Sequence, residues 1–383
     1  MKITNLETFV LWDRSAALKV STDEGLSGWG EPVVEGRADT TTAAVHEMAE
    51  LLIGRDPDQI EDIWQSLYRG GFYRGGPILM SAIAGIDQAL WDIKGKRYGL
   101  PVYQMLGGRV RDRMQVYAWI GGENPEQAAA MARERLVQGY QAIKMSEGAA
   151  NMRYFETRAV VDAVIEMVGA VRQAIGNETG LGIDFHGHLH KGLAKVVAHE
   201  LEQFHPLFIE EPVLPENNDA LREIARASSI PIATGERMFS RWDFKKLLQE
   251  GYVDIIQPDL SHAGGISEVR RIAAMAEAYD VAVAPHCPLG PLAFLSALQL
   301  DFAAPNAFIQ EQVLELHDVP NSRPLQIMLN RYEIQYKDGF VAPPAGPGLG
   351  IEVDEGLVRQ IASEGGRWHV PLCRASDGSI AEW

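Results

Sequence analysis

Seven polar side chains recur at nearly even spacing through the middle of the chain. They are Lys144, Asp184, Glu210, Glu236, Asp259, His286 and Glu311. The first gap is 40 residues, and the following gaps are 26, 26, 23, 27 and 25 residues. Each of the shorter gaps has the length of one strand plus one helix, and the strands of an α/β barrel all end on the same rim. The spacing therefore predicts one site, built from several strand ends.

Three consecutive members of this series are carboxylates, Asp184, Glu210 and Glu236, and are called the acid triad below. Three carboxylates on one rim repel one another, so their pKa values would rise unless a cation neutralised them. Oxygen ligands without cysteine suit a hard divalent ion, Mg²⁺ before Mn²⁺ or Ca²⁺. Pairing of each acid with an arginine such as Arg237 is the alternative. Three acids in register favour the metal site.

A histidine and a carboxylate come later in the series. His286 follows a strand expected at residues 281–285, and Asp259 ends the preceding strand. A carboxylate next to an imidazole fixes its tautomer and raises its basicity, which suits a general base. A rim histidine held by a structural acid is the alternative. Because the pair faces the acid triad, we predict a base beside a metal.

Three of the ten histidines lie in the stretch Asp184–His190. Alternate residues of a strand point to the same side, so His186 is predicted to share the inward face with Asp184 and to act on a metal-bound substrate. We expect His188 and His190 in the following loop, and Gly187 would let that loop approach a ligand closely. The His-x-His pattern also suits a dinuclear zinc hydrolase, but such a site needs further histidines on later strands, where this chain has carboxylates.

The elements that would position these groups alternate regularly from about residue 115. Helical segments, for example 125–138 and 265–278, separate eight apolar stretches that read as strands. The strands are expected at 116–120, 142–145, 181–185, 207–211, 230–234, 254–258, 281–285 and 308–312. Eight such units predict a parallel (β/α) barrel with its site at the carboxyl ends of the strands.

The chain outside this repeat reads differently. The first part has three short strands, at 4–11, 17–21 and 26–30, followed by a helix with apolar residues at Ala82, Ile86, Ala89, Leu90 and Ile93. We therefore divide the chain into an α+β capping domain at 1–114, a catalytic barrel at 115–320 and a C-terminal segment at 321–383 that returns to the capping domain. An insertion at Glu147–Phe155 accounts for the long first gap.

Composition excludes several classes of protein. The 383 residues are 46% hydrophobic and 23% charged, which is typical of a globular enzyme. The net charge of −17 disfavours nucleic acid and would repel an anionic substrate unless a bound cation reversed the local sign. Two cysteines without a CxxC pair fit a reducing cytoplasm. We expect no membrane span and no signal peptide, since neither apolar pattern is present.

These residues resemble the enolase superfamily, in its mandelate racemase branch, and more closely the sugar-acid dehydratases that act on D-galactonate. The resemblance covers nearly the whole chain. It is carried by the stretches Gly71–Gly95, Asp184–Gly187, Phe208–Leu214, Gly235–Arg241, Gln257–Gly265, Ala284–Pro291 and Gly348–Gly350. The combination of Asp184-Phe-His186 with Pro285-His-Cys-Pro-Leu-Gly-Pro291 is specific to the dehydratases.

The resemblance implies a (β/α)7β barrel with an α+β cap and a role for each site residue. The acid triad would bind Mg²⁺, and His286 with Asp259 would remove the proton at C2. His186 would protonate the leaving 3-hydroxyl, and Glu311 would support the enediolate oxygen. The product would be a 2-keto-3-deoxy acid, here 2-dehydro-3-deoxy-D-galactonate. It also implies a homo-oligomer, often an octamer.

Alternatives remain open at this point. Racemases of this branch carry Lys-x-Lys on the second barrel strand, whereas this chain has Lys144-Met145-Ser146, so elimination is favoured over two-base racemisation. Lys144 would contact either the substrate carboxylate or neighbouring acids. The loop Leu11–Ala17 shapes the distal pocket in this superfamily and does not identify the sugar. Gluconate or another aldonate, an epimerase or lactonising reaction, and a binding protein without chemistry are the competing hypotheses.

Overall fold

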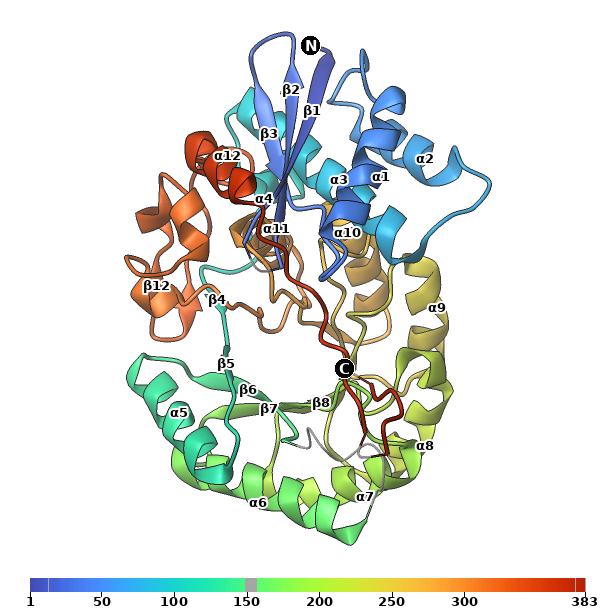
Figure 1. The fold of residues 1–383 in the computed structure, drawn as a ribbon, viewed down its shortest axis with the longest axis vertical. Helices are drawn as coiled ribbons and strands as arrows, with labels where there is room; N and C mark the ends of the chain where they lie inside the picture. Colours follow the sequence, from blue (N-terminus) through green and yellow to red (C-terminus); the bar gives the residue numbers. More distant parts are fainter. Residues whose placement is uncertain (13, 149–156, 376, 383) are drawn as a thin grey trace.

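The computed structural model describes the chain apart from residues 13, 149–156, 376 and 383. Most of the predicted insertion at Glu147–Phe155 therefore lies outside the described residues. The protein has a capping domain, at the top of Figure 1, and a barrel below it, as predicted. The exact boundaries at residues 114 and 320 stay a prediction. No helix among the described residues is both long and apolar enough to cross a membrane.

The capping domain is an antiparallel sheet covered by helices. The strands lie in the order β1 (Ile3–Val10), β2 (Ala16–Thr22), β3 (Ser27–Gly30), and the helices are α1 (Ala38–Met48), α2 (Ile60–Arg69) and α3 (Gly76–Tyr98). Pro77 in the first turn and left-handed Gly99 at the end mark the limits of α3, which carries the apolar stripe predicted from the sequence. On α3 the Gln88 amide donates to Leu260 O at 3.0 Å and the Trp91 indole to Ser267 Oγ at 2.9 Å. These bonds tie the cap to the barrel.

Seven parallel strands form the barrel sheet in chain order. They are β5 (Ala118–Ile120), β6 (Ala142–Ser146), β7 (Gly180–Asp184), β8 (Phe208–Glu210), β9 (Ile232–Thr234), β10 (Ile255–Ile256) and β11 (Ala282–Val283). The helices between and after them are α5 (Pro125–Val137), α6 (Arg158–Ile175), α7 (Lys191–Leu201), α8 (Leu221–Ala227), α9 (Arg241–Glu250), α10 (Gly265–Glu277) and α11 (Pro291–Ala303). This order is the predicted alternation, and it brings all strand ends to one rim.

The segment predicted as the eighth strand, at 308–312, closes the barrel without forming a regular strand. Ala307 bridges to Val283 of β11, and Gln310 bridges to Val116 just before β5. Two residues three positions apart thus pair with opposite edges of the open sheet, so no continuous ladder forms with either neighbour. The first strand is also shorter than predicted, since β5 begins at Ala118 and Val116 makes only an isolated bridge to Gln310. The two residues before Val116, Met114–Gln115 (β4), pair with a different sheet.

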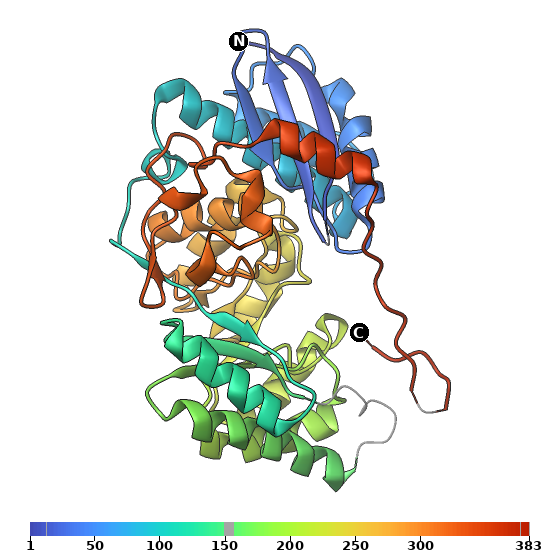
Figure 2. The same cartoon turned by 60° about the vertical axis from the view of Figure 1, so that its left-hand side comes forward.

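The C-terminal segment covers two places rather than one. The hairpin of β12 (Tyr336–Lys337) and β13 (Phe340–Val341) pairs with β4, where the predicted cap and barrel meet. Helix α12 (Glu355–Glu364) packs against β1 of the capping domain. The bounds of the C-terminal segment stay a prediction. Figure 2 shows the chain leaving α12 and running from the cap toward the level of the barrel.

Candidate active site

The acid triad converges on one centre. Asp184 is the last residue of β7, Glu210 is the last residue of β8, and Glu236 follows β9 by two residues. One carboxylate oxygen from each lies within 4.8 Å of the others. Burial, and after it the charge of Asp184, raises the pKa of Glu210 well above its usual range. The three acids therefore form a cluster that needs positive charge.

Lys144 supplies part of that charge. Its ammonium donates to both oxygens of Glu210, at 2.7 and 2.9 Å, and lies 2.9 Å from Glu311 Oε1 and 3.4 Å from Asp184 Oδ2. Burial would lower the pKa of Lys144, but these carboxylates outweigh it and hold the pKa well above its usual range. Lys144 is therefore charged, and of the two predicted contacts it makes the one to neighbouring acids.

The remaining oxygens fit a hard divalent cation. Asp184 Oδ2 and Glu236 Oε2 are buried and accept no regular hydrogen bond among the described residues, although Lys144 and His186 lie within ion-pair distance of Asp184 Oδ2. Buried carboxylate oxygens are costly unless positive charge offsets them, and a cation bound by both oxygens would do so. The donor set is entirely oxygen, which Mg²⁺, Mn²⁺ and Ca²⁺ prefer. Arg237, the arginine named in the alternative hypothesis, pairs with Glu211 and not with the triad.

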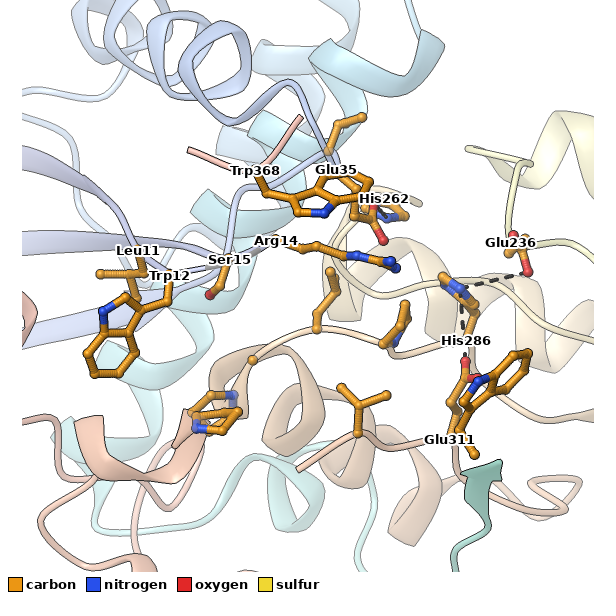
Figure 3. A pocket seen from close by; sticks show the side chains of 18 of the residues that line it. Leu11, Trp12, Arg14, Ser15, Glu35, Glu236, His262, His286, Glu311 and Trp368 are labelled. Carbon is orange, nitrogen blue, oxygen red and sulfur yellow. Dashed lines mark ion pairs between the residues drawn. The ribbon is translucent and has the colours of Figure 1, made fainter. Parts of the chain in front are cut away.

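The predicted dyad of His286 and Asp259 is present. The two residues follow β11 and β10, and His286 Nδ1 lies 2.8 Å from Asp259 Oδ2. Asp259 Oδ1 accepts a bond from Ser261 N at 2.6 Å, which fixes the carboxylate. His286 Nε2 points the other way, 3.7 Å from Glu236 Oε2 (Figure 3). The ring thus presents one nitrogen to the triad and keeps the other on Asp259.

His186 reaches the site by a different route from the one predicted. The strand ends at Asp184, and His186 has a positive φ of 48°, so strand alternation does not place it. Its N–H donates to Asp184 Oδ1 at 2.9 Å, and its Nε2 lies 3.1 Å from Asp184 Oδ2. Burial would lower the pKa of His186, but the Asp184 carboxylate outweighs it and raises the pKa to about 9.

The residues that follow His186 make contacts that hold the loop between β7 and α7 in place. Gly187 has a φ of 65°, and a Cβ there would meet Leu214 at 2.7 Å, so it permits close packing on Leu214 rather than on a ligand. His188 Nδ1 bonds to buried Glu147 Oε1 at 2.8 Å, and His190 lies immediately before α7. The predicted loop position of His188 and His190 is correct.

Glu311 completes the barrel side of the site. Cys287 N donates to Glu311 Oε2 at 2.8 Å, and the same oxygen lies 3.9 Å from His286 Nε2. The charge of Lys144, and after it that of His286, outweighs burial and holds the pKa of Glu311 below its usual value. Glu311 is therefore an ionised group within reach of both Lys144 and His286.

These groups line a cavity of about 740 Å³ between barrel and cap. His286, Glu236 and Glu311 lie on one side in Figure 3, and residues from the loop after β1 and from the C-terminal segment lie on the other. That second side includes Leu11, Trp12, Arg14, Ser15, Arg323 and Trp368. The cavity has room for a small organic acid, with Lys144, Asp184, Glu236 and Glu311 on the barrel side and the two arginines on the cap side.

The sequence analysis did not identify a further histidine, His262, as part of the site. His262 Nε2 lies 3.2 Å from Glu35 Oε2 in the cap and 3.7 Å from Asp259 Oδ2, while its Nδ1 lies 3.2 Å from Ser81 Oγ. Asp259, His262 and His286 could also hold a metal by distance. Glu35, His262, Asp259 and His286 thus form a chain of ion-pair contacts from the cap to the triad. The spacing Asp259-x-x-His262 was the available signal.

Comparison with known proteins identifies the family. Residues 8–107 match the mandelate racemase/muconate lactonizing enzyme N-terminal domain, and residues 127–357 match the enolase C-terminal domain-like family. Proteins named D-galactonate dehydratase from Ralstonia pickettii and Pectobacterium atrosepticum are each 52% identical over 383 residues, covering both chains completely.

Solved structures agree in fold. An enolase from Agrobacterium radiobacter with bound sodium and L-malate is 31% identical, with a TM-score of 0.90 over all of both chains. A member of the enolase superfamily from Salmonella Typhimurium is 32% identical, with a TM-score of 0.87 over 94% of this chain and 98% of that one. The chain therefore belongs to the D-galactonate dehydratase family, in the mandelate racemase/muconate lactonizing enzyme branch of the enolase superfamily.

Proposed function

We propose that this protein is a hydro-lyase that converts D-galactonate to 2-dehydro-3-deoxy-D-galactonate. The observation that carries the proposal is the convergence of the acid triad on one centre, with His186 and His286 approaching it from different strands. An elimination needs a base and an acid, and these two histidines supply both. The identity of 52% to D-galactonate dehydratases over the full length supports the choice of substrate.

His286 is the proposed base for the C2 proton. When His286 is neutral and Nδ1–H donates to Asp259 at 2.8 Å, its Nε2 lone pair faces the triad. Asp259 thereby fixes the tautomer and stabilises the imidazolium formed after proton transfer. General-base help of this kind is worth about 10²–10⁴-fold in rate.

The triad is proposed to hold Mg²⁺. When bound, the ion would spread the negative charge that develops on the substrate carboxylate as the C2 proton leaves, and would offset the charge of the three acids. Lys144 is proposed to assist by its positive charge beside the substrate carboxylate. Glu311, fixed by Cys287 N, is proposed to support the enediolate oxygen.

His186 is proposed to protonate the departing 3-hydroxyl. Hydroxide is a poor leaving group, so elimination requires a proton donor close to C3. The bond from His186 N–H to Asp184 Oδ1 fixes the backbone, and Trp119 packs near the ring, with centroids 6.2 Å apart. The donor is thereby held beside Asp184, whereas His286 Nε2 lies beside Glu236.

The test is turnover of D-galactonate with Mg²⁺ present, followed as 2-keto-3-deoxy acid. A panel of diastereomeric aldonates, gluconate included, should be run in parallel. Formation of the keto acid from D-galactonate at the highest kcat/KM is expected. A C2 epimer or lactone as product, or faster conversion of another aldonate, would contradict the proposal. A homo-oligomer in the cytoplasm is proposed on the family resemblance alone, and its size can be measured by light scattering.

A further inference from the structure

We propose that residues 366–370 of the C-terminal tail form part of the wall of the sugar-acid pocket, with Trp368 as a specificity-determining residue. The proposal rests on the proposed function, because it assigns one end of the same substrate to this wall. The tail comes from a chain region far from every barrel strand. Neither its position nor its contacts follow from the barrel repeat.

The tail is held on the cap at two points that flank Trp368. Helix α12 ends at Gly365, and the Arg367 guanidinium then pairs with Asp39 at 2.9 Å. Val370 presses on Gly36, where an added Cβ would lie 2.5 Å from Val370 Cγ2. Gly36 also has a φ of 71°, so this turn suits glycine for two reasons. These contacts fix the backbone around Trp368 although most tail residues are exposed.

Trp368 itself faces the cavity and meets Arg14. The Arg14 guanidinium carbon lies 4.6 Å from the centre of the indole ring, and both residues line the cavity. Figure 3 shows Arg14 extending beneath the indole with its guanidinium end toward His286. Trp368 and Arg14 come from opposite ends of the chain, and the guanidinium lies over one face of the indole, so the two side chains form a stacked cation–aromatic wall.

This surface suits the part of an aldonate that does not react. C1 to C3 must lie near the triad, His286 and His186, where the barrel side is filled by charged side chains. The chain from C4 to C6 must then extend toward the cap. An indole face covers C–H groups, and a guanidinium donates hydrogen bonds to hydroxyl oxygens. Trp368 therefore makes the enzyme selective for the length and the terminal group of the sugar acid, without contacting the reacting atoms.

The experiment compares three substrates that share their configuration at C2 to C4. These are D-galactonate, D-fuconate, which lacks the 6-hydroxyl, and L-arabinonate, which lacks C6. For Trp368→Ala we expect KM for D-galactonate to rise about tenfold with kcat changed less than about twofold, in the range known for losing one pocket contact. The preference for D-galactonate over L-arabinonate should fall by about the same factor. Trp368→Phe should keep most of that preference.

Two truncations provide matched controls. Removal of the residues after Leu372 leaves Trp368 and Val370 in place, and we expect kcat and KM for the three substrates to stay unchanged. Removal of residues after Gly366 should reproduce Trp368→Ala. An unchanged preference in Trp368→Ala, or equal losses on all three substrates, would overturn the proposal. If the wild type converts a different aldonate, the proposed function fails, and the same comparison is then made with that aldonate and its analogue shortened by one carbon.

Discussion

The two sides of the pocket are built in different ways. On the barrel side the side chains are buried, charged and connected, as in the contacts of Lys144 with Glu210 and Glu311. On the cap side the groups come from a loop and a tail, and their contacts are ring against cation, as for Arg14 with Trp368 and Arg323 with Trp12. The two proposals together assign the chemistry to rigid strand ends, and the recognition of the substrate to segments that can vary without disturbing them.

If the barrel side carries the chemistry, loss of the cation should have the largest effect. Chelation of divalent ions should reduce turnover of D-galactonate by at least about 10³-fold, because several kcal/mol of charge stabilisation are lost. Added Mg²⁺ should restore it. The measurement is keto-acid formation alongside elemental analysis, and full activity in protein shown to be free of metal would contradict the assignment.

His286→Asn should be the most damaging change of a single catalytic group. We expect a loss of about 10²–10⁴-fold, since the base for C2 is removed. Exchange of the C2 proton with deuterated solvent should be lost together with turnover. Mg²⁺ affinity, measured by calorimetry, should stay close to that of the wild type, and retained exchange would show that another group acts as base.

His186→Asn tests the second half of the elimination. Keto-acid formation should fall by up to about 10²–10⁴-fold, because the leaving hydroxyl lacks its proton donor. Exchange at C2 should survive, since His286 and Asp259 are untouched. Parallel loss of exchange and elimination would mean that His186 does not act separately from the base.

At the pair of Glu35 and His262, where the two sides of the pocket meet, we expect an effect on the stability of the fold. Burial would raise the pKa of Glu35, but the charge of His262 outweighs burial and lowers this pKa to about 2. Burial would lower the pKa of His262, but the charges of Asp259 and then Glu35 outweigh burial and raise this pKa to about 9. The ion pair therefore stabilises the fold between about pH 4.5 and 6.5. This stabilisation is lost as the pH rises through about 9, and also as it falls through about 2.

Glu35→Gln should accordingly lower the free energy of unfolding by about 3 kcal/mol near pH 6. The difference from the wild type should shrink above about pH 9, where His262 is neutral. Denaturant unfolding at the two pH values measures it. Glu223→Gln removes an exposed pair with Lys191 and Lys195 and serves as the control, with little change at either pH. A constant difference across the range would exclude the ion pair as the cause.

Sequence patterns predicted the barrel side of the site in considerable detail. The even spacing from Asp184 to Glu311 reflects the repeat of strand and helix, and the structure brings these side chains to one rim. The limits of α3 follow from two local signals, Pro77 in its first turn and Gly99 at its end. Local signals were insufficient for residues 308–312, where two long-range bridges replace a strand.

The sequence by itself therefore determined the groups that recur once in each strand-and-helix unit of the barrel. These are the acid triad and the dyad of Asp259 and His286, which share one rim. Their positions depend on strand length and helix length, which are local properties. Only the tertiary structure decided which distant segments meet these groups. The contact of Glu35 with His262 and the contact of Trp368 with Arg14 each join two segments that are far apart in the sequence. No repeat in the sequence relates these segments, so the contacts arise from tertiary packing alone.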